Sequence, residues 1–207
     1  MNLLEKSIPY KSIIMRCDSI NRNAFSEVEE CFSIVKYKPG MKSVWIEIQK
    51  AAGQFEGYSD ADIADYFEKT FLYDSSEIDE RCFFLKDNVE EACIGTCCAW
   101  FSNKGKRIVP VLHWLAVVPT HRNRGCARML ITYVLKYFEK KYGNQAVYLH
   151  TQPESYQAIK LYNDFGFNIT QEDSYGHAVN EYEDAMEILK EVMNSEAYKR
   201  LKNTAVQ

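Results

Sequence analysis

Hydrophobic and polar positions along the chain follow two periods, and this predicts a mixed α/β protein. Residues 11–16 and 31–36 are short apolar runs with the composition of strands. Residues 42–52 then show apolar side chains at helical spacing. A second helix is expected after Ser59, because this serine and Asp62 have the spacing of a capping box.

The middle of the chain predicts antiparallel strands. The acidic segment 74–80 is typical of a loop or a helical turn, and a strand is expected at 82–85. Two longer apolar strands, 92–101 and 107–118, are separated by the polar segment 103–106, which indicates a hairpin loop. We therefore expect this part of the sheet to be antiparallel.

The strand that ends at Pro119 leads into a basic loop and then into a helix. The amide N–H groups of a first helical turn have no partners within the helix, and the helix dipole adds positive charge there. A strand, a basic loop around Gly125 and a helix N-terminus predict a site for a phosphate-bearing ligand. The alternative is a tight turn with solvated arginines. The apolar face of this helix consists of Ala127, Leu130, Ile131, Val134, Leu135 and Phe138.

The rest of the chain predicts a parallel crossover. Residues 146–151 are apolar enough for a strand buried in a parallel pair. Pro153 opens a short helix, and Gly166 ends it. A strand is expected at 167–170 and a helix at 181–203. The apolar side of the short helix contains Ala158, Leu161, Tyr162 and Phe165.

Composition narrows the class of protein. The chain has 207 residues, of which 46% are hydrophobic and 26% charged, as in an ordinary globular protein. Its net charge of −4 disfavours nucleic acid as the main ligand. The sequence contains no apolar run of about 18 residues, the length that a membrane-spanning helix needs, so we expect no such helix. Residues 1–10 lack the apolar region of a signal peptide. The seven cysteines have no CxxC spacing, so we expect reduced, mostly buried thiols and a cytoplasmic protein.

Two motifs in the order found here resemble the GNAT superfamily of acetyl-CoA-dependent N-acetyltransferases. Residues 122–127, RNRGCA, match the R/Q-x-x-G-x-G/A signature, and residues 115–119, LAVVP, resemble the L-x-V-x-P strand that precedes it. Residues 158–167, AIKLYNDFGF, match A-x-x-L-Y-x-x-x-G-F. The resemblance is tight over residues 81–170.

The resemblance implies one α/β domain over residues 1–207. Its central twisted sheet would be mostly antiparallel, with one parallel βαβ crossover, a splay between the family's fourth and fifth strands, and flanking helices. Residues 1–30 would be an N-terminal extension. The helix at 181–203 would replace the usual final strand, and it could seal the acceptor side or form a homodimer contact.

The resemblance also implies how acetyl-CoA is held. The basic loop would bind the pyrophosphate, chiefly through backbone N–H groups, and the preceding strand would pair its backbone with the pantetheine arm. Ser155 stands where many members have asparagine, and it could instead cap the short helix. The residues implied in cofactor binding are Leu115, Ala116, Val117, Arg122, Asn123, Arg124, Gly125, Cys126, Ala127, Arg128, Ser155 and Tyr162.

Proton transfer has three candidate residues. Tyr162 matches the family tyrosine that protonates the departing thiolate, although a buried aromatic on an amphipathic helix is the other interpretation. The strand position of the general base of some members is taken by Val111, which has no basic group. His113 lies on the same strand face and could act as the base, or it could be a packed histidine. His150 is a further candidate, and a metal shared by the two histidines is disfavoured because no carboxylate or thiol spacing supports it.

Cys126 lies at the expected helix N-terminus among arginines. This environment favours a lowered thiol pKa, so a nucleophilic role is chemically possible. The family resemblance implies instead that only its backbone faces the pyrophosphate.

These observations predict an enzyme, an N-acetyltransferase that moves an acetyl group from acetyl-CoA to a primary amine by direct attack in a ternary complex. The alternative is a non-catalytic acyl-CoA-binding sensor domain. The expected partner is a small-molecule or peptide amine, with neither nucleic acid nor membrane. Acidic residues either attract a cationic amine or form a solvated surface; they are Asp60, Asp62, Asp74, Glu77 and Asp79.

Overall fold

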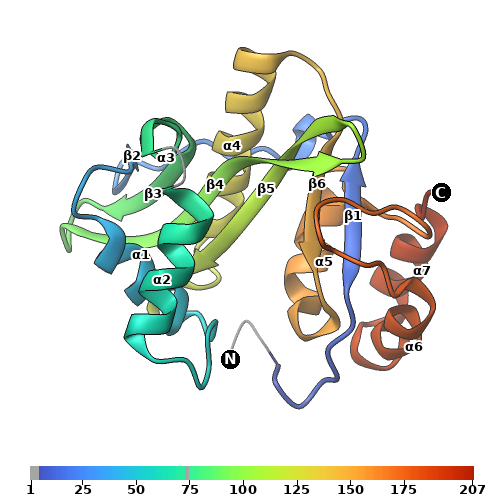
Figure 1. Cartoon of the computed structure of the whole chain (residues 1–207). Helices are drawn as coiled ribbons and strands as arrows, with labels where there is room; N and C mark the ends of the chain where they lie inside the picture. Colours follow the sequence, from blue (N-terminus) through green and yellow to red (C-terminus); the bar gives the residue numbers. More distant parts are fainter. Residues whose placement is uncertain (1–4, 73–74) are drawn as a thin grey trace. The chain divides into compact units, whose positions relative to one another are not determined.

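The computed structural model describes residues 5–72 and 75–207 of the chain (Figure 1). These residues form two compact units, and each is described by itself. Among the described residues, the first unit comprises 26–100 and 114–137, and the second comprises 5–25, 101–113 and 138–207. Strands β4 (Ala92–Lys104) and β5 (Arg107–Val117) contribute residues to both units.

The first unit contains the antiparallel strands that the sequence predicts. Strand β2 (Phe32–Lys36) pairs with β3 (Cys82–Asp87), and β3 pairs with β4, both antiparallel. The acidic segment expected as a loop or a turn is largely helix α3, and its Asp74 lies outside the described residues. The helices of this unit are α1 (Lys42–Ala51), α2 (Asp60–Phe71), α3 (Ser75–Arg81) and most of α4 (Cys126–Tyr142).

Aromatic packing joins α1 and α2. Trp45, Phe67 and Phe71 are fully buried, and the Trp45 ring lies 5.1 Å from that of Phe67 and 5.5 Å from that of Phe71. Helix α2 begins at the predicted capping box. The Ser59 hydroxyl accepts a hydrogen bond from the Asp62 amide, and the Asp62 carboxylate accepts one from the Ser59 amide, both at 3.2 Å.

In the second unit, β1 (Ile13–Cys17) is an inner strand. It pairs antiparallel with β6 (Val147–Thr151) along its whole length and with β7 (Asn168–Ile169) on the other side. The predicted parallel crossover is confirmed, because β5 pairs in parallel with β6 at Val111 and Tyr148. The resulting strand order among the described residues is β2-β3-β4-β5-β6-β1-β7. The segment expected as an N-terminal extension therefore contains a structural strand of the sheet.

The C-terminal segment differs from its prediction as a single helix. It forms α6 (Tyr182–Val192) and α7 (Ser195–Asn203), both visible in red in Figure 1. Met193 has an extended backbone, and the Asn194 side chain accepts a hydrogen bond of 2.8 Å from the Ala197 amide. An asparagine N-cap therefore starts a new helix although the apolar spacing continues through it. No helix in the described part of the chain is long and apolar enough to cross a membrane.

Candidate functional site

The basic loop lies between the short helix η2 (Pro119–His121) and α4. Asn123 and Gly125 have left-handed backbones, with φ of 60° and 76°. A Cβ on Gly125 would lie 3.7 Å from the Met129 methyl group, an ordinary contact. Backbone conformation rather than space therefore favours glycine here. The first turn of α4, which begins at Cys126, contains no acidic residue, so its amides and dipole fit a phosphate group.

The arginines of the loop have different surroundings. Arg122 is half-buried, and this burial lowers the pKa of its guanidinium. Arg124 is exposed, with its guanidinium 5.2 Å from the centre of the Phe32 ring and 4.0 Å from the Asp87 carboxylate. Strands β2 and β3 therefore help to place the Arg124 charge. Ala127 and Arg128 are half-buried in the first turn of α4.

A buried pair, Asp87 and His121, anchors this loop to β3. The Asp87 carboxylate accepts a hydrogen bond of 3.1 Å from His121 Nε2. It also accepts hydrogen bonds from the amides of Val89 at 2.8 Å and Glu90 at 3.0 Å. The bond from the Glu90 amide is the main cause that lowers the pKa of Asp87. No sequence pattern predicts this pair, because no spacing links residues so far apart in the chain.

The same residues bear on metal binding. Ligand atoms of Asp87, Glu90 and His121 lie within 4.8 Å of one another, close enough for a metal ion. The direct hydrogen bond between Asp87 and His121 already accounts for the two buried members. We therefore assign this cluster to placement of the loop.

Strand β5 contains a backbone irregularity at Trp114. Its φ of 52° is in the left-handed region, which is unusual for a bulky residue. The Trp114 carbonyl accepts a hydrogen bond of 3.0 Å from Nε2 of Gln49, a fully buried residue of α1. Leu115 follows, half-buried, and then the buried Ala116 and Val117. The strand segment expected to pair with the pantetheine arm thus begins at this left-handed irregularity, here called the bulge, and a side chain of α1 holds its carbonyl. A bulge in this strand was expected from the family resemblance, whereas no sequence pattern predicts the contact with Gln49.

Tyr162 and Ser155 lie in the second unit. Tyr162 is on α5 (Tyr156–Asp164), is 8% exposed, and packs its ring 6.1 Å from that of Phe167. The buried face of α5 is centred on Ile159 and Tyr162, whereas the expected Ala158 and Leu161 are only half-buried. Ser155 holds the N-cap position, but its side chain forms no capping hydrogen bond. The alternative of Ser155 as a helix cap is therefore wrong.

The two candidate histidines also lie in the second unit. Burial and the neighbouring His150 lower the pKa of His113 to about 4. Burial also lowers the pKa of His150, whose Nε2 lies 2.9 Å from the Ser12 hydroxyl. His113 is consequently neutral at pH 7 and only a weak base. Its assignment as the general base stays a prediction.

Cys126 differs from its expected surroundings. The residue is 2% exposed, and burial raises the pKa of its thiol despite the opposing charge of Arg124. The expected lowering of this pKa is wrong, because desolvation outweighs the arginine. The result favours a backbone role for Cys126. All seven cysteines are free, and most are buried.

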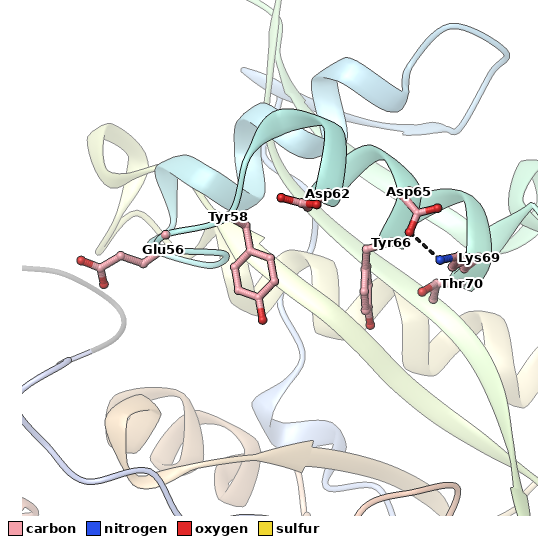
Figure 2. A pocket seen from close by; sticks show the side chains of 8 residues that line it. Glu56, Tyr58, Asp62, Asp65, Tyr66, Lys69 and Thr70 are labelled. Atoms are coloured by element: carbon pink, nitrogen blue, oxygen red, sulfur yellow. Dashed lines mark ion pairs between the residues drawn. The ribbon is translucent and has the colours of Figure 1, made fainter.

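An open pocket of about 810 Å³ lies beside α2 (Figure 2). Two tyrosine rings and three carboxylates contribute to it. Of the acidic residues that the sequence singled out and the structure describes, Asp62 alone lines this pocket. Asp60 instead pairs with Lys50, and Glu77 pairs with Arg81. The lining residues are Glu56, Gly57, Tyr58, Asp62, Asp65, Tyr66, Lys69 and Thr70.

The model of the Acetyltransferase (GNAT) family matches residues 44–167, more than half of the chain. The chain belongs to the GNAT family. Enzymes of this family use acetyl-CoA as the acetyl donor. The family model includes the bulged β5, the loop, α4 and the motif on α5.

Solved structures share this GNAT fold at low sequence identity. A GCN5-related N-acetyltransferase from Sphaerobacter thermophilus is 17% identical with a TM-score of 0.59, and the match covers 81% of this chain and 50% of that one. Aminoglycoside N-acetyltransferase AAC(6′)-Iy, solved in complex with CoA, is 20% identical with a TM-score of 0.52, and the match covers 69% of this chain and 90% of that one. A GNAT acetyltransferase from Colwellia psychrerythraea is 13% identical with a TM-score of 0.56, and the match covers 78% of this chain and 53% of that one. The chain thus spans about half the length of the Sphaerobacter protein. No curated protein matches the sequence.

Proposed function

We propose that this chain is an N-acetyltransferase that acetylates a primary amine of a small molecule or peptide by direct attack in a ternary complex. The observation that carries the proposal is the junction of β5 and α4. There, a strand with a bulge at Trp114 leads through the left-handed residues Asn123 and Gly125 into a helix N-terminus. When bound, acetyl-CoA supplies the activated thioester.

The first unit would bind and orient the donor. The N–H groups from Arg124 to Arg128 hold the pyrophosphate, and the arginine side chains add positive charge. The backbone of Leu115, Ala116 and Val117 pairs with the pantetheine arm and polarises the thioester carbonyl. Gln49 keeps the bulge in place through its hydrogen bond to the Trp114 carbonyl.

Proton transfer completes the reaction. The amine nitrogen bonds to the acetyl carbon, the carbon–sulfur bond breaks, and the sulfur leaves as a thiolate that receives a proton. Tyr162 is the proposed donor of this proton, by its place in the family motif and the usual pKa of a phenol, about 10. His113 is the proposed base, and its pKa of about 4 limits it to passing the amine proton on to water.

A sensor that binds acyl-CoA without turnover is the second candidate. It is favoured by the apolar Val111 at the strand position of a general base and by the low pKa of His113. Loss of a strong base would leave binding intact and remove most of the catalytic proton transfer.

The test measures thiol release from acetyl-CoA with polyamines, aminoglycosides, amino acids and peptides as acceptors. We expect amine-dependent release, and we expect Tyr162→Phe to lower kcat by about a hundredfold without raising KM for acetyl-CoA. The matched control is Tyr175→Phe, which removes another buried phenol of the same unit. No release with any amine, alongside tight CoA binding, would favour the sensor or an acceptor outside this panel.

The free, mostly buried thiols fit a reducing compartment. We therefore place the proposed activity in the cytoplasm. Homodimer formation stays a prediction, checked by light scattering.

A further inference from the structure

A continuous set of aromatic rings extends from the pocket beside α2 to strand β5, and two of them, Tyr58 and Tyr66, line the pocket. We call Phe55, Tyr58, Tyr66 and Trp114 the aromatic wall. The Phe55 ring stacks on Trp114 at 5.1 Å and forms T-shaped contacts with Tyr58 at 6.0 Å and with Tyr66 at 5.3 Å. Tyr66 also contacts Trp114 edge-on at 5.3 Å. The pocket is therefore connected, through packed rings, to the bulge that precedes Leu115.

The two tyrosine rings remain accessible although their neighbours are packed. Tyr58 is 63% exposed and Tyr66 is 37% exposed. In Figure 2 both side chains point in the same direction from the α1–α2 turn and from α2. Accessible ring faces attract cations, because the faces of an aromatic quadrupole are negative.

The charged side chains that line the pocket also favour a cation. Glu56, Asp62 and Asp65 carry three negative charges, and Lys69 carries one positive charge, a net of two negative charges. The Lys69 ammonium is already 2.7 Å from the Asp65 carboxylate. Glu56 has no ion-pair partner among the residues that the structure describes. An incoming cation therefore meets aromatic faces together with uncompensated carboxylate charge.

We propose that the pocket between Tyr58 and Tyr66 binds an ammonium group of the acceptor, and that the acceptor carries a positive charge in addition to the amine that is acetylated. This inference rests on the proposed function. The second charge follows from chemistry: an amine held against rings and carboxylates stays protonated, and a protonated amine has no lone pair with which to attack a thioester. The anchoring ammonium and the reacting nitrogen are therefore different groups of one molecule.

The first experiment compares three acceptors that differ at one end only. They are 1,4-diaminobutane, 4-aminobutan-1-ol and 4-aminobutanoate, each with a primary amine and with a cationic, neutral or anionic second group. We expect kcat/KM to fall in that order, by about fivefold at each step. Equal kcat/KM for the diamine and the amino alcohol would overturn the inference while the proposed function stands.

Variants then locate the effect. Tyr58→Leu removes an exposed ring, and we expect it to raise KM for the diamine about fivefold while KM for acetyl-CoA is unchanged. Tyr58→Phe keeps the ring face and should raise KM for the diamine less than Tyr58→Leu does. Glu56→Gln should also raise this KM, whereas Glu68→Gln, a carboxylate of α2 outside the pocket, should not. Identical KM values in Tyr58→Leu and the wild type would refute the site.

A binding measurement separates the two proposals. Calorimetry with 1,4-diaminobutane, without acetyl-CoA, should give binding to the wild type and a loss of about fivefold in affinity in Tyr58→Leu. If no amine is acetylated but this binding pattern is found, the proposed function fails and the cation site stands. If an amine is acetylated but the diamine binds both proteins alike, the cation site fails and the proposed function stands.

Discussion

Two surfaces of the first unit carry opposite charge and are made in different ways. The basic loop before α4 offers backbone amides in a fixed conformation, with arginines around them. The pocket beside α2 is lined mainly by side chains, among them two exposed tyrosine rings and three carboxylates. The backbone site depends on a few consecutive residues, whereas the side-chain site depends on packing between separate elements. The first should be sensitive to backbone geometry and the second to ring and charge content.

Gly125→Ala should give the largest effect on the basic loop. Alanine at φ of 76° costs about 1–2 kcal/mol of folding free energy, and displaced amides should weaken CoA binding by about tenfold or more. Gly105→Ala is the matched control, because Gly105 has φ of 59° and open space around it. Calorimetry and urea unfolding should show similar destabilisation in both variants but weak CoA binding only in Gly125→Ala. Equal CoA affinity in the two variants would contradict a role of the loop in CoA binding.

Gln49→Leu tests whether the bulge depends on a distant side chain. The variant leaves the Trp114 carbonyl without its donor, which should destabilise the protein by about 1–3 kcal/mol. We also expect kcat to fall while the Kd of CoA stays near that of the wild type, because the pyrophosphate loop is untouched. Ile48→Val, a neighbouring core substitution, should cost about 0.5–1.5 kcal/mol and leave kcat unchanged. An unchanged kcat in Gln49→Leu would separate the bulge from turnover.

Charge reversal should distinguish the two surfaces more finely. Glu56→Lys should raise KM for a dicationic amine about fivefold without altering the Kd of CoA. Glu68→Lys is the control outside the pocket. Steady-state kinetics at low and high salt checks the result, since added salt should reduce the difference. A matching rise in the Kd of CoA would show that the two surfaces are not independent.

The smallest effect concerns pH. The pKa of Asp87 is lowered in the folded protein, so its stabilising contribution is present above the usual carboxyl pKa of about 4 and is lost as the pH falls through the lowered value. Between about pH 5 and pH 3, the range around the usual carboxyl pKa, the free energy of unfolding should therefore vary less in Asp87→Asn than in the wild type. Urea titrations at several pH values measure this slope. Identical slopes in both proteins would mean that Asp87 titrates alike when folded and unfolded.

Local signals made part of this architecture predictable. Ser59 and Asp62 form their capping box within one turn, and the strand–loop–helix around Gly125 is consecutive in sequence. The family motifs lie in the same segments. Prediction failed where partners are distant. Neither the contact between Asp87 and His121 nor that between Gln49 and Trp114 has a sequence period.

The helix break at Asn194 was missed for a different reason. Apolar side chains recur on both sides of it, so the periodicity hides a change of backbone at Met193. The pocket was also only partly predicted. Asp62 was among the predicted acidic residues, but the place of the Tyr58 and Tyr66 rings in the pocket depends on the fold of the α1–α2 turn.

The place of β1 sets an order of events for folding. This strand precedes the other described strands in the chain, yet its hydrogen-bonding partners β6 and β7 are the last two of them. During synthesis β1 must therefore wait, with both edges unpaired, until β6 has emerged. Closing so long a loop slows folding and raises the contact order of the second unit. The nascent chain is exposed to edge-to-edge association throughout that interval, and a chaperone that shields apolar strands would act there.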